Sequence, residues 1–483
     1  MDKSISGITY EKNGWKYISI WGDPLDRGIA YGYYSAPEFE RIQKMLVYHA
    51  YESTGRQWSF FVDVARKHFT QTIKRRFPEL YLELKGIAEG CIKYGLDTNI
   101  DEIIAWNNYI TILECWYPMW LRKKNAKSGT SENIPSLKEG GSSDRCSAFI
   151  ATGKYTTDGK IVVAHNSFVD FIDGQYYRTI LDINPSSGHR ILMQTCACSI
   201  WSGTDFFVTS AGIIGTETTI GGFTAYQNNL PISCRIRTAM QYATQLDDYV
   251  TILLDGNSGD YANSWLLGNI HTNEIMRFEL GLKYWDVQRT TDGYFYGCNF
   301  AFSPEIRNFE CVNTGYCDIR RHQGARQVRI PELIDTYKGK IDVNVAKTII
   351  SDHYDVYLKK TNPCSRTVCS HYELDAREYM SDPGRPKPYT PKGAVDGMVA
   401  DANMIRNMSF SAKYGSSCNI PFTVESFCKE HAQWSHLKPY LLDRPVEPWT
   451  IFTTHSLVES VKNTKKSRHN YTAKLHPSSR KSH

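Results

Sequence analysis

The spacing of apolar residues changes along the chain from a helical period to a strand period. Between residues 78 and 94, apolar side chains recur every three or four positions, which predicts an amphipathic helix that starts at Pro78 and stops at Gly95. Asn99 is expected to cap the next helix, with Glu102 as its capping-box partner. From residue 146 onward, short apolar runs alternate with turn residues, a pattern typical of strands.

Turn residues divide the chain into expected hairpins. Asn13-Gly14 marks a hairpin over residues 7–21, and Thr157-Asp158-Gly159 joins strands at 146–152 and 160–168. Further strands are expected at 177–183, 189–196, 205–210, 212–219, 264–270, 275–280 and 284–289, helices at 235–243 and 343–353, and a loop at 377–395. Runs of strands interrupted by helices predict an α+β fold with antiparallel sheets covered by helices.

Composition limits the function classes. With 483 residues, 41% hydrophobic and 22% charged, the chain has room for one large or two ordinary globular domains. Much of the net charge of +5 lies in the tail at 459–483, so the body indicates no nucleic-acid binding. This basic, polar tail is expected to be disordered and suits weak contact with an anionic surface.

The chain shows no signal peptide and no apolar run of transmembrane length, so a cytoplasmic or particle-associated protein is expected. Its 13 cysteines are an odd number and, without a secretory signal, are expected to be mostly reduced thiols.

Cys146 lies where a polar linker, residues 122–145, meets the first buried strand. Cleavage of the Arg145–Cys146 bond would turn Cys146 into a new N-terminus. Such a residue supplies a nucleophilic thiol and a base, since an α-amine has an ordinary pKa of about 7.7–8.0. The alternative is a buried core thiol without a chemical role.

Several segments resemble those of one protein family, in the same order along the chain. Residues 146–150 (CSAFI) and 162–168 (VVAHNSF), the stretch from 205 to 220 with its ETTI sequence, and residues 257–265 (NSGDYANSW) resemble the phospholipase B-like proteins. These are N-terminal-nucleophile hydrolases related to the acyl-CoA:6-aminopenicillanate acyltransferases, which residues 22–28 and 83–90 resemble. The similarity extends over most of residues 15–450.

The resemblance implies a four-layer αββα sandwich over residues 146–458, preceded by a mostly helical region at 1–121 that becomes the small chain of a self-cleaving precursor. It implies Cys146 as nucleophile, His165 nearby, Asn299 as oxyanion ligand and Arg320 as active-site arginine, with Arg321 as the alternative. Thr219 and Phe168 are expected to line the substrate site, and Phe168 stands where the family has Trp.

Each of these residues also has a structural interpretation. His165 could be a core histidine, Asn299 a turn residue, and Arg320 and Arg321 part of a solvated helix face. Cys364, Cys369 and His371 are spaced like part of a zinc site. No second matched pair is near, because Cys418, Cys428 and His431 are irregularly spaced, so neither a metal nor a cofactor is expected.

The favoured function is a self-processing cysteine hydrolase that removes acyl chains from lipid esters or amides. An N-acyl amide hydrolase or acyltransferase is one alternative. Another is an enzyme that acts uncut with His165 as base, and a third is a non-catalytic structural or binding protein that kept the fold.

Overall fold

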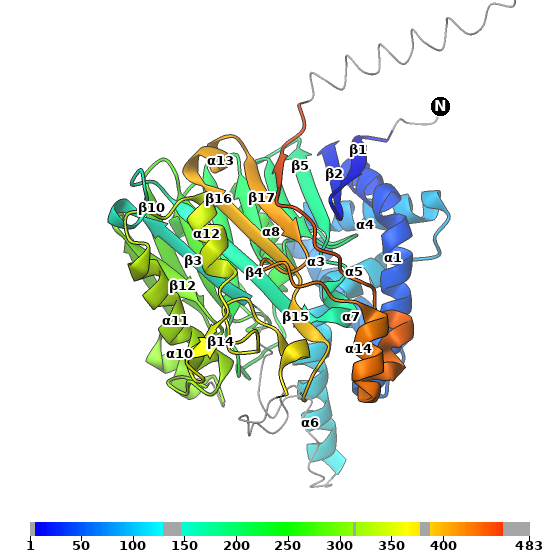
Figure 1. The fold of residues 1–483 in the computed structure, drawn as a ribbon. Coiled ribbons are helices and arrows are strands. Elements are labelled where there is room, and N and C mark those ends of the chain that lie inside the picture. Colours follow the sequence, from blue (N-terminus) through cyan, green and yellow to red (C-terminus); the bar gives the residue numbers. More distant parts are fainter. Residues whose placement is uncertain (1–4, 129–145, 313–314, 377–386, 457–483) are drawn as a thin grey trace, which may run out of the picture.

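The computed structural model describes residues 5–128, 146–312, 315–376 and 387–456. Among these residues, nine strands form the larger sheet (Figure 1). In spatial order they are β1 (Gly7–Lys12), β2 (Trp15–Gly22), β5 (Thr179–Pro185), β6 (Ile191–Thr195), β7 (Phe206–Thr209), β8 (Ile213–Thr219), β9 (Asn263–Asn269), β10 (Glu274–Leu280) and β11 (Trp285–Thr290). All neighbours are antiparallel except β2 and β5, which pair in parallel and so depart from the expected antiparallel pattern.

A second sheet contains Cys146. Its strands are β12 (Gly293–Gly297), β3 (Cys146–Thr152), β4 (Val162–Asp170), β16 (Asp396–Asp401), β17 (Ser409–Tyr414) and β18 (Thr450–Thr453), with β15 (Lys392–Ala394) paired to β4. A small ladder joins β13 (Tyr354–Asp355) to β14 (Lys360–Thr361). The expected hairpin at residues 146–168 is confirmed as β3 and β4, which pair with Cys146 opposite Ser167 and Ala148 opposite His165.

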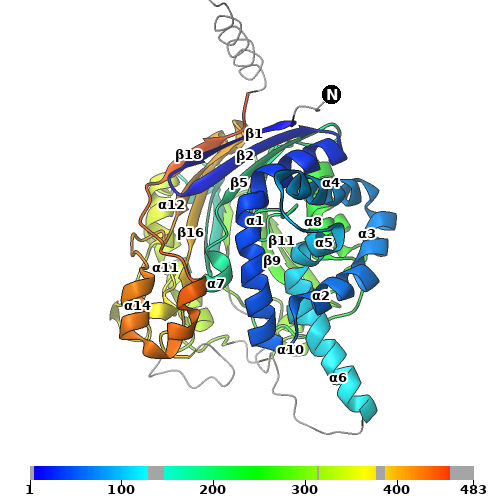
Figure 2. The same cartoon turned by 90° about the vertical axis from the view of Figure 1, so that its right-hand side faces the viewer.

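The two sheets pack face to face, and helices cover their outer faces (Figures 1 and 2). One apolar cluster draws side chains from both sheets, including Ile150, Val163, Ile180 and Leu266. The outer face of the larger sheet packs against helices from the N-terminal region and from residues 232–254. Two helices within residues 322–350 cover β3 and β4. Because side chains alternate along a strand, Cys146, Ala148 and Ile150 point into the space between the sheets.

The helices over the larger sheet are α1 (Pro24–Thr54), α2 (Trp58–Ala65), α3 (Gln71–Arg76), α4 (Pro78–Tyr94), α5 (Ile100–Asn107), α6 (Tyr117–Ser128), α8 (Ile232–Tyr242) and α9 (Leu246–Leu254), with π-helical turns η1 (Arg66–Thr70) and η2 (Thr111–Trp116). Those over the smaller sheet are α11 (His322–Thr336) and α12 (Val343–Ile350). The connections hold α7 (Phe171–Gly174), α10 (Pro304–Phe309), α13 (Ala402–Arg406), α14 (Val424–Glu430), and 3-10 segments η3 (Gly153–Tyr155), η4 (Tyr372–Leu374) and η5 (Ala432–Tyr440).

The helix predicted from residue 78 is confirmed as α4, which Gly95 ends with a left-handed φ of 108°. Asn99 caps α5 as expected, since its side chain accepts a hydrogen bond from the Glu102 N–H. The Glu102 carboxylate instead accepts bonds from Thr98 and Gln43, so its expected return bond to Asn99 is replaced.

The N-terminal region is helical as expected, but its hairpin does more than wrap those helices. Strands β1 and β2 extend the larger sheet through the pairing of β2 with β5. Helix α6 continues to Ser128, past the expected start of the linker at 122. The rest of that linker and the tail at 459–483 lie outside the described residues. None of the helices that the structure describes is both long and apolar enough to cross a membrane.

Candidate active site

Cys146 is the first residue of β3 and is 1% exposed. Its backbone N–H donates to Oδ1 of Asn299 at 3.3 Å, and its thiol donates to Oδ2 of Asp205 at 3.7 Å. The nitrogen that would become an α-amine after cleavage therefore already faces a hydrogen-bond acceptor. Both atoms of Cys146 that could react therefore have a polar neighbour in the protein interior.

Asn299 follows β12 and is completely buried. Its Oδ1 accepts from the Cys146 N–H and from Nη2 of Arg326 at 2.9 Å, while its Nδ2 donates to the carbonyl oxygen of Thr219 at 2.8 Å. Because a guanidinium can only donate, the amide oxygen must face Arg326, which defines the orientation of the amide group. One Nδ2 hydrogen beyond that bonded to Thr219 can then serve an oxyanion.

Arg326 on α11 is the arginine that reaches Cys146. Its Nη1 donates to the carbonyl oxygen of Cys146 at 2.6 Å and to Oγ of Ser147 at 3.1 Å. Its guanidinium also lies 4.7 Å from the centroid of the Phe168 ring, a cation–π distance. These contacts fix the start of β3 relative to α11.

Asp205 lies directly before β7 and completes the polar surroundings of the thiol. Its carboxylate accepts from the Tyr261 hydroxyl at 3.2 and 3.3 Å, in addition to the Cys146 thiol. Asp205 and Asn299 both have left-handed backbones, with φ of 72° and 69°. Non-glycine residues in this region are uncommon and gather at functional sites.

His165 on β4 lies close to Cys146. One of its ring nitrogens, the Cys146 sulfur and an Asp205 carboxylate oxygen lie within 4.8 Å of one another. Burial lowers the pKa of His165 to about 3, and its contact with the Glu217 backbone offsets this only in part. His165 is therefore neutral near pH 7 and is a weak base.

Thr219 and Phe168, expected to line the substrate site, lie on either side of the Asn299–Arg326 pair. The Thr219 carbonyl holds Asn299, and the Thr219 hydroxyl has no hydrogen-bond partner within the described ranges. The Arg326 guanidinium lies over the Phe168 ring, at the position where the phospholipase B-like proteins, which the sequence resembles, have Trp. The position therefore supports a cation instead of offering an N–H donor.

The arginine that contacts Cys146 is neither of the two that the sequence prediction names. Arg320 is 57% exposed and pairs with Asp318 at the surface, with its Nε 2.9 Å from the carboxylate. Arg321, the alternative, is buried at the start of α11, where its backbone N–H donates to the Asp318 carbonyl. The contact with Cys146 comes from Arg326, which is one and a half helical turns further along. The expected cleavage residue Arg145 lies outside the described residues.

Sequence reasoning missed Asp205, Tyr261 and Arg326 as site residues. Asp205 and Tyr261 stand inside segments that carried the family resemblance, so their place in those segments was the available signal. Arg326 was hidden in a run of arginines from 320 to 329, because periodicity alone does not tell which member of such a run turns inward.

An apolar pocket lies beside this group. It is lined by Trp106 and Tyr109 from the helical region, by Tyr177 and Trp201, and by Thr204, the neighbour of Asp205. The Trp201 ring meets the Tyr261 ring edge to face at 5.6 Å between centroids, and Tyr261 bonds Asp205. The pocket and the thiol are thus linked by one chain of contacts.

Comparison with solved structures gives partial likenesses to conjugated bile acid hydrolase from Clostridium perfringens. A mutant of that enzyme aligns with 56% of this chain and 89% of its own, at 7% identity and a TM-score of 0.34. A second variant aligns with 55% of this chain and 89% of its own, at 9% identity and a TM-score of 0.35. No family model and no curated protein matches the sequence. At this level the likeness carries no weight for the function of this chain.

Proposed function

We propose that this chain is a cysteine acyl hydrolase of the N-terminal-nucleophile type, matured by cleavage of its Arg145–Cys146 bond. The observation that carries the proposal is the hydrogen bond from the Cys146 nitrogen to Asn299, formed beside a thiol that faces Asp205. A core cysteine needs neither contact. The two facing sheets with helices on their outer faces support the proposal, since an αββα sandwich is the fold expected for such an enzyme.

Maturation begins with the Cys146 thiolate attacking the carbonyl carbon of Arg145. The C–N bond between the two residues breaks, and the freed amine takes the proton lost by the thiol. Water then hydrolyses the thioester, which leaves a carboxylate on Arg145 and a free amine on Cys146. Arg326, bonded to the Cys146 carbonyl, keeps the residue in place while its preceding bond is cut.

In each turnover, the Cys146 sulfur attacks the substrate carbonyl while the α-amine takes the thiol proton. The same amine delivers the proton to the leaving alcohol or amine, and water releases the acyl group from the thioester. Asn299 orients the amine through Oδ1 and offers its second Nδ2 hydrogen to the oxyanion. The Thr219 hydroxyl, which is buried and has no hydrogen-bond partner among the described residues, is proposed to bond the substrate.

The substrate class that we propose is a lipid ester with an apolar acyl chain, as for a phospholipase B-like enzyme. The support is the pocket beside Asp205, which is lined by four aromatic rings. These rings suit hydrocarbon, and the polar members of the lining are Asn107, Asp173, Ser199 and Thr204. An N-acyl amide with the same chain would bind the same lining, so the bond that is cut has to be found by assay.

The assay uses the processed protein and two substrates that share one acyl chain, a phospholipid and an N-acyl amide. Release of the fatty acid from the phospholipid is expected, and Cys146→Ala, which should stay uncut, should reduce it about 10⁴-fold or more. Cys428→Ser, a substitution of a buried thiol in α14, is the matched control and should keep the activity. Release from the amide alone would change the substrate class, whereas no release from either would contradict the proposal.

One rival mechanism has a specific observation in its favour. Cys146, His165 and Asp205 lie together, as they would in an enzyme that uses histidine as base without chain cleavage. The low pKa of His165, about 3, argues against it, because a base this weak does not deprotonate a thiol effectively. An uncut protein that hydrolyses either substrate, and loses this activity on His165→Gln, would favour the rival.

A further inference from the structure

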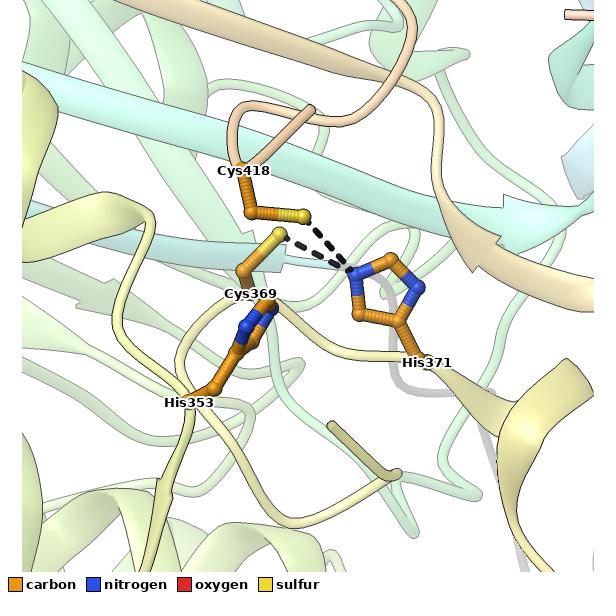
Figure 3. A group of neighbouring side chains, drawn as sticks. All are labelled: His353, Cys369, His371 and Cys418. Carbon is orange, nitrogen blue, oxygen red and sulfur yellow. Dashed lines mark hydrogen bonds between the residues drawn. The ribbon is translucent and has the colours of Figure 1, made fainter. Parts of the chain in front are cut away.

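A second group of chemically reactive side chains lies away from Cys146. His353, Cys369, His371 and Cys418 converge so that one ligand atom from each lies within 4.8 Å of all the others (Figure 3). Nε2 of His371 is 3.4 Å from the Cys369 sulfur and 3.2 Å from the Cys418 sulfur. In a tetrahedral zinc site the sulfur and nitrogen ligands lie roughly 3.3–3.8 Å apart, as follows from Zn–S and Zn–N bonds of about 2.3 and 2.0 Å.

Three separate segments supply the four residues. His353 follows α12, Cys369 and His371 lie in the loop between β14 and η4, and Cys418 follows β17. The backbone holds them together, since the Cys369 N–H donates to the Asp352 carbonyl at 3.2 Å. The Ser417 hydroxyl donates to the carbonyl of Ile350 at 3.0 Å. The group is thus built by the fold and does not depend on flexible side chains meeting at a surface.

The surroundings of His371 are those of a metal-bound histidine. Its Nδ1 lies 2.7 Å from Oε1 of Glu373, so that Nδ1–H donates to the carboxylate and the lone pair of Nε2 points at the two sulfurs. A carboxylate behind a ligating histidine fixes the tautomer and raises the basicity of the ligand. The Cys369 sulfur in turn lies 3.3 Å from the Ser417 hydroxyl oxygen.

His353 supplies the fourth position. Its ring centroid lies 5.2 Å from that of His371, with the ring planes 72° apart. Its buried Nε2 makes no hydrogen bond to any residue that the structure describes. A buried imidazole nitrogen without a partner costs free energy unless another group occupies it.

We propose that His353, Cys369, His371 and Cys418 bind one zinc ion in a closed, four-coordinate structural site. Two thiolates with two imidazoles are a ligand set that zinc prefers, and four protein ligands leave no open position for catalysis. The competing arrangement is a disulfide between Cys369 and Cys418, in which neither thiolate would remain to bind a metal ion.

The ion would brace the segment that supports the nucleophile strand. The loop carrying Cys369 and His371 also presents the Val368 carbonyl, which accepts from Oγ of Ser147 at 2.9 Å. Ser147 is the neighbour of Cys146 and a partner of Arg326. A zinc ion that holds this loop to α12 and β17 would therefore help to keep the start of β3 in position.

Spacing along the sequence could not reveal this site. Cys369 and His371 belong to the sequence pattern that resembles part of a zinc site, but the other cysteine of that pattern, Cys364, lies elsewhere and bonds Asp355. The other two ligands, His353 and Cys418, are 65 positions apart in the chain and meet only in the folded protein.

The first test is the metal content of the full chain, purified under reducing conditions without chelator. One zinc ion per chain is expected. Cys418→Ser and His371→Gln should each abolish stoichiometric zinc, whereas Cys364→Ser, the matched cysteine control, should keep it. Glu373→Gln should keep the ion but weaken its affinity about 10- to 100-fold, as measured by competition with a chelator.

The second test uses the unmodified chain and so does not depend on the variants folding. X-ray absorption at the zinc edge should give two sulfurs at about 2.3 Å and two nitrogens at about 2.0 Å. Cys369 and Cys418 should resist alkylation until a chelator is added. A reduced chain that neither carries zinc nor binds added zinc would overturn the proposal, as would a Cys369–Cys418 disulfide found by mass spectrometry of the native protein.

Discussion

Arg326 contacts Cys146, whereas the sequence analysis names Arg320 or Arg321 as the arginine expected there. It is a fully buried cation that bonds the Cys146 carbonyl, Ser147 and Asn299, and its guanidinium stacks on Phe168. A guanidinium presents several donors in a rigid plane, whereas a lysine ammonium is a single point charge. Only arginine can serve these three acceptors from one position on α11.

Arg326→Lys should lower kcat/KM of the processed enzyme about 100-fold, because displacing a nucleophile by about 1 Å costs rates of that order. The loss should fall on kcat more than on KM, since Arg326 positions Cys146 and is not proposed to bind the substrate. Arg320→Lys is the control at the exposed position and should have no effect. Equal effects of the two substitutions would contradict the assignment of Arg326.

Asp396 gives a prediction about pH. It accepts from the Ser167 N–H and from Gln194, but burial outweighs these bonds and raises its pKa to about 6. Between about pH 4 and 6 the folded state therefore binds more protons than the unfolded state, so the contribution of this group to stability is lost as the pH rises.

Asp396→Asn should accordingly gain stability relative to the original chain as the pH rises from about 4 to 6, by up to about 3 kcal/mol. Denaturant unfolding of both chains across this range measures the difference. A difference in the free energy of unfolding that stays constant with pH would show that the raised pKa of Asp396 is wrong.

At the scale of elements, α1 and α4 pack backbone against backbone. Gly28 and Gly32 on α1 face Gly86 and Gly90 on α4, and each Cβ that could be added there would meet a main-chain oxygen at 2.0 to 2.4 Å. The pair is further joined by Arg27, whose guanidinium bonds Glu83 at 2.7 Å in the interior. This contact joins α1 closely to α4.

Gly32→Ala should destabilise the protein by about 1–3 kcal/mol, because its Cβ would lie 2.0 Å from the Ile87 carbonyl oxygen unless the two helices separate. Thermal unfolding of the variant should show the loss. Glu40→Ala, at an exposed position of the same helix, is the control and should change stability little. An unchanged unfolding temperature for Gly32→Ala would mean that the helices are not in such close contact.

At the scale of the whole molecule, local sequence patterns predict helices and strands. Contacts between segments that are distant in the sequence form the candidate site. The α4 helix and the β3–β4 hairpin could be predicted because their periodicity, caps and turns are all encoded within about 20 residues. The parallel pairing of β2 with β5 could not be predicted, since 156 residues lie between the end of β2 and the start of β5.

The same contrast applies to the residues around Cys146. His165 lies two positions from the direct strand partner of Cys146, so a local hairpin brings it close. Asn299, Asp205 and Arg326 come from other elements, and the resemblance indicated only the first of them. Which arginine of a basic helix turns inward depends on how α11 sits on the sheet, which no local pattern contains.

The proposed hydrolase activity depends on Cys146 becoming a chain terminus. The most direct measurement is the intact mass of the purified full-length protein beside that of its Cys146→Ala variant. Two fragments are expected for the first, one of them beginning with Cys146, and a single chain for the second. A protein that stays in one piece, or is cut at the same bond in Cys146→Ala, would contradict self-processing by this thiol.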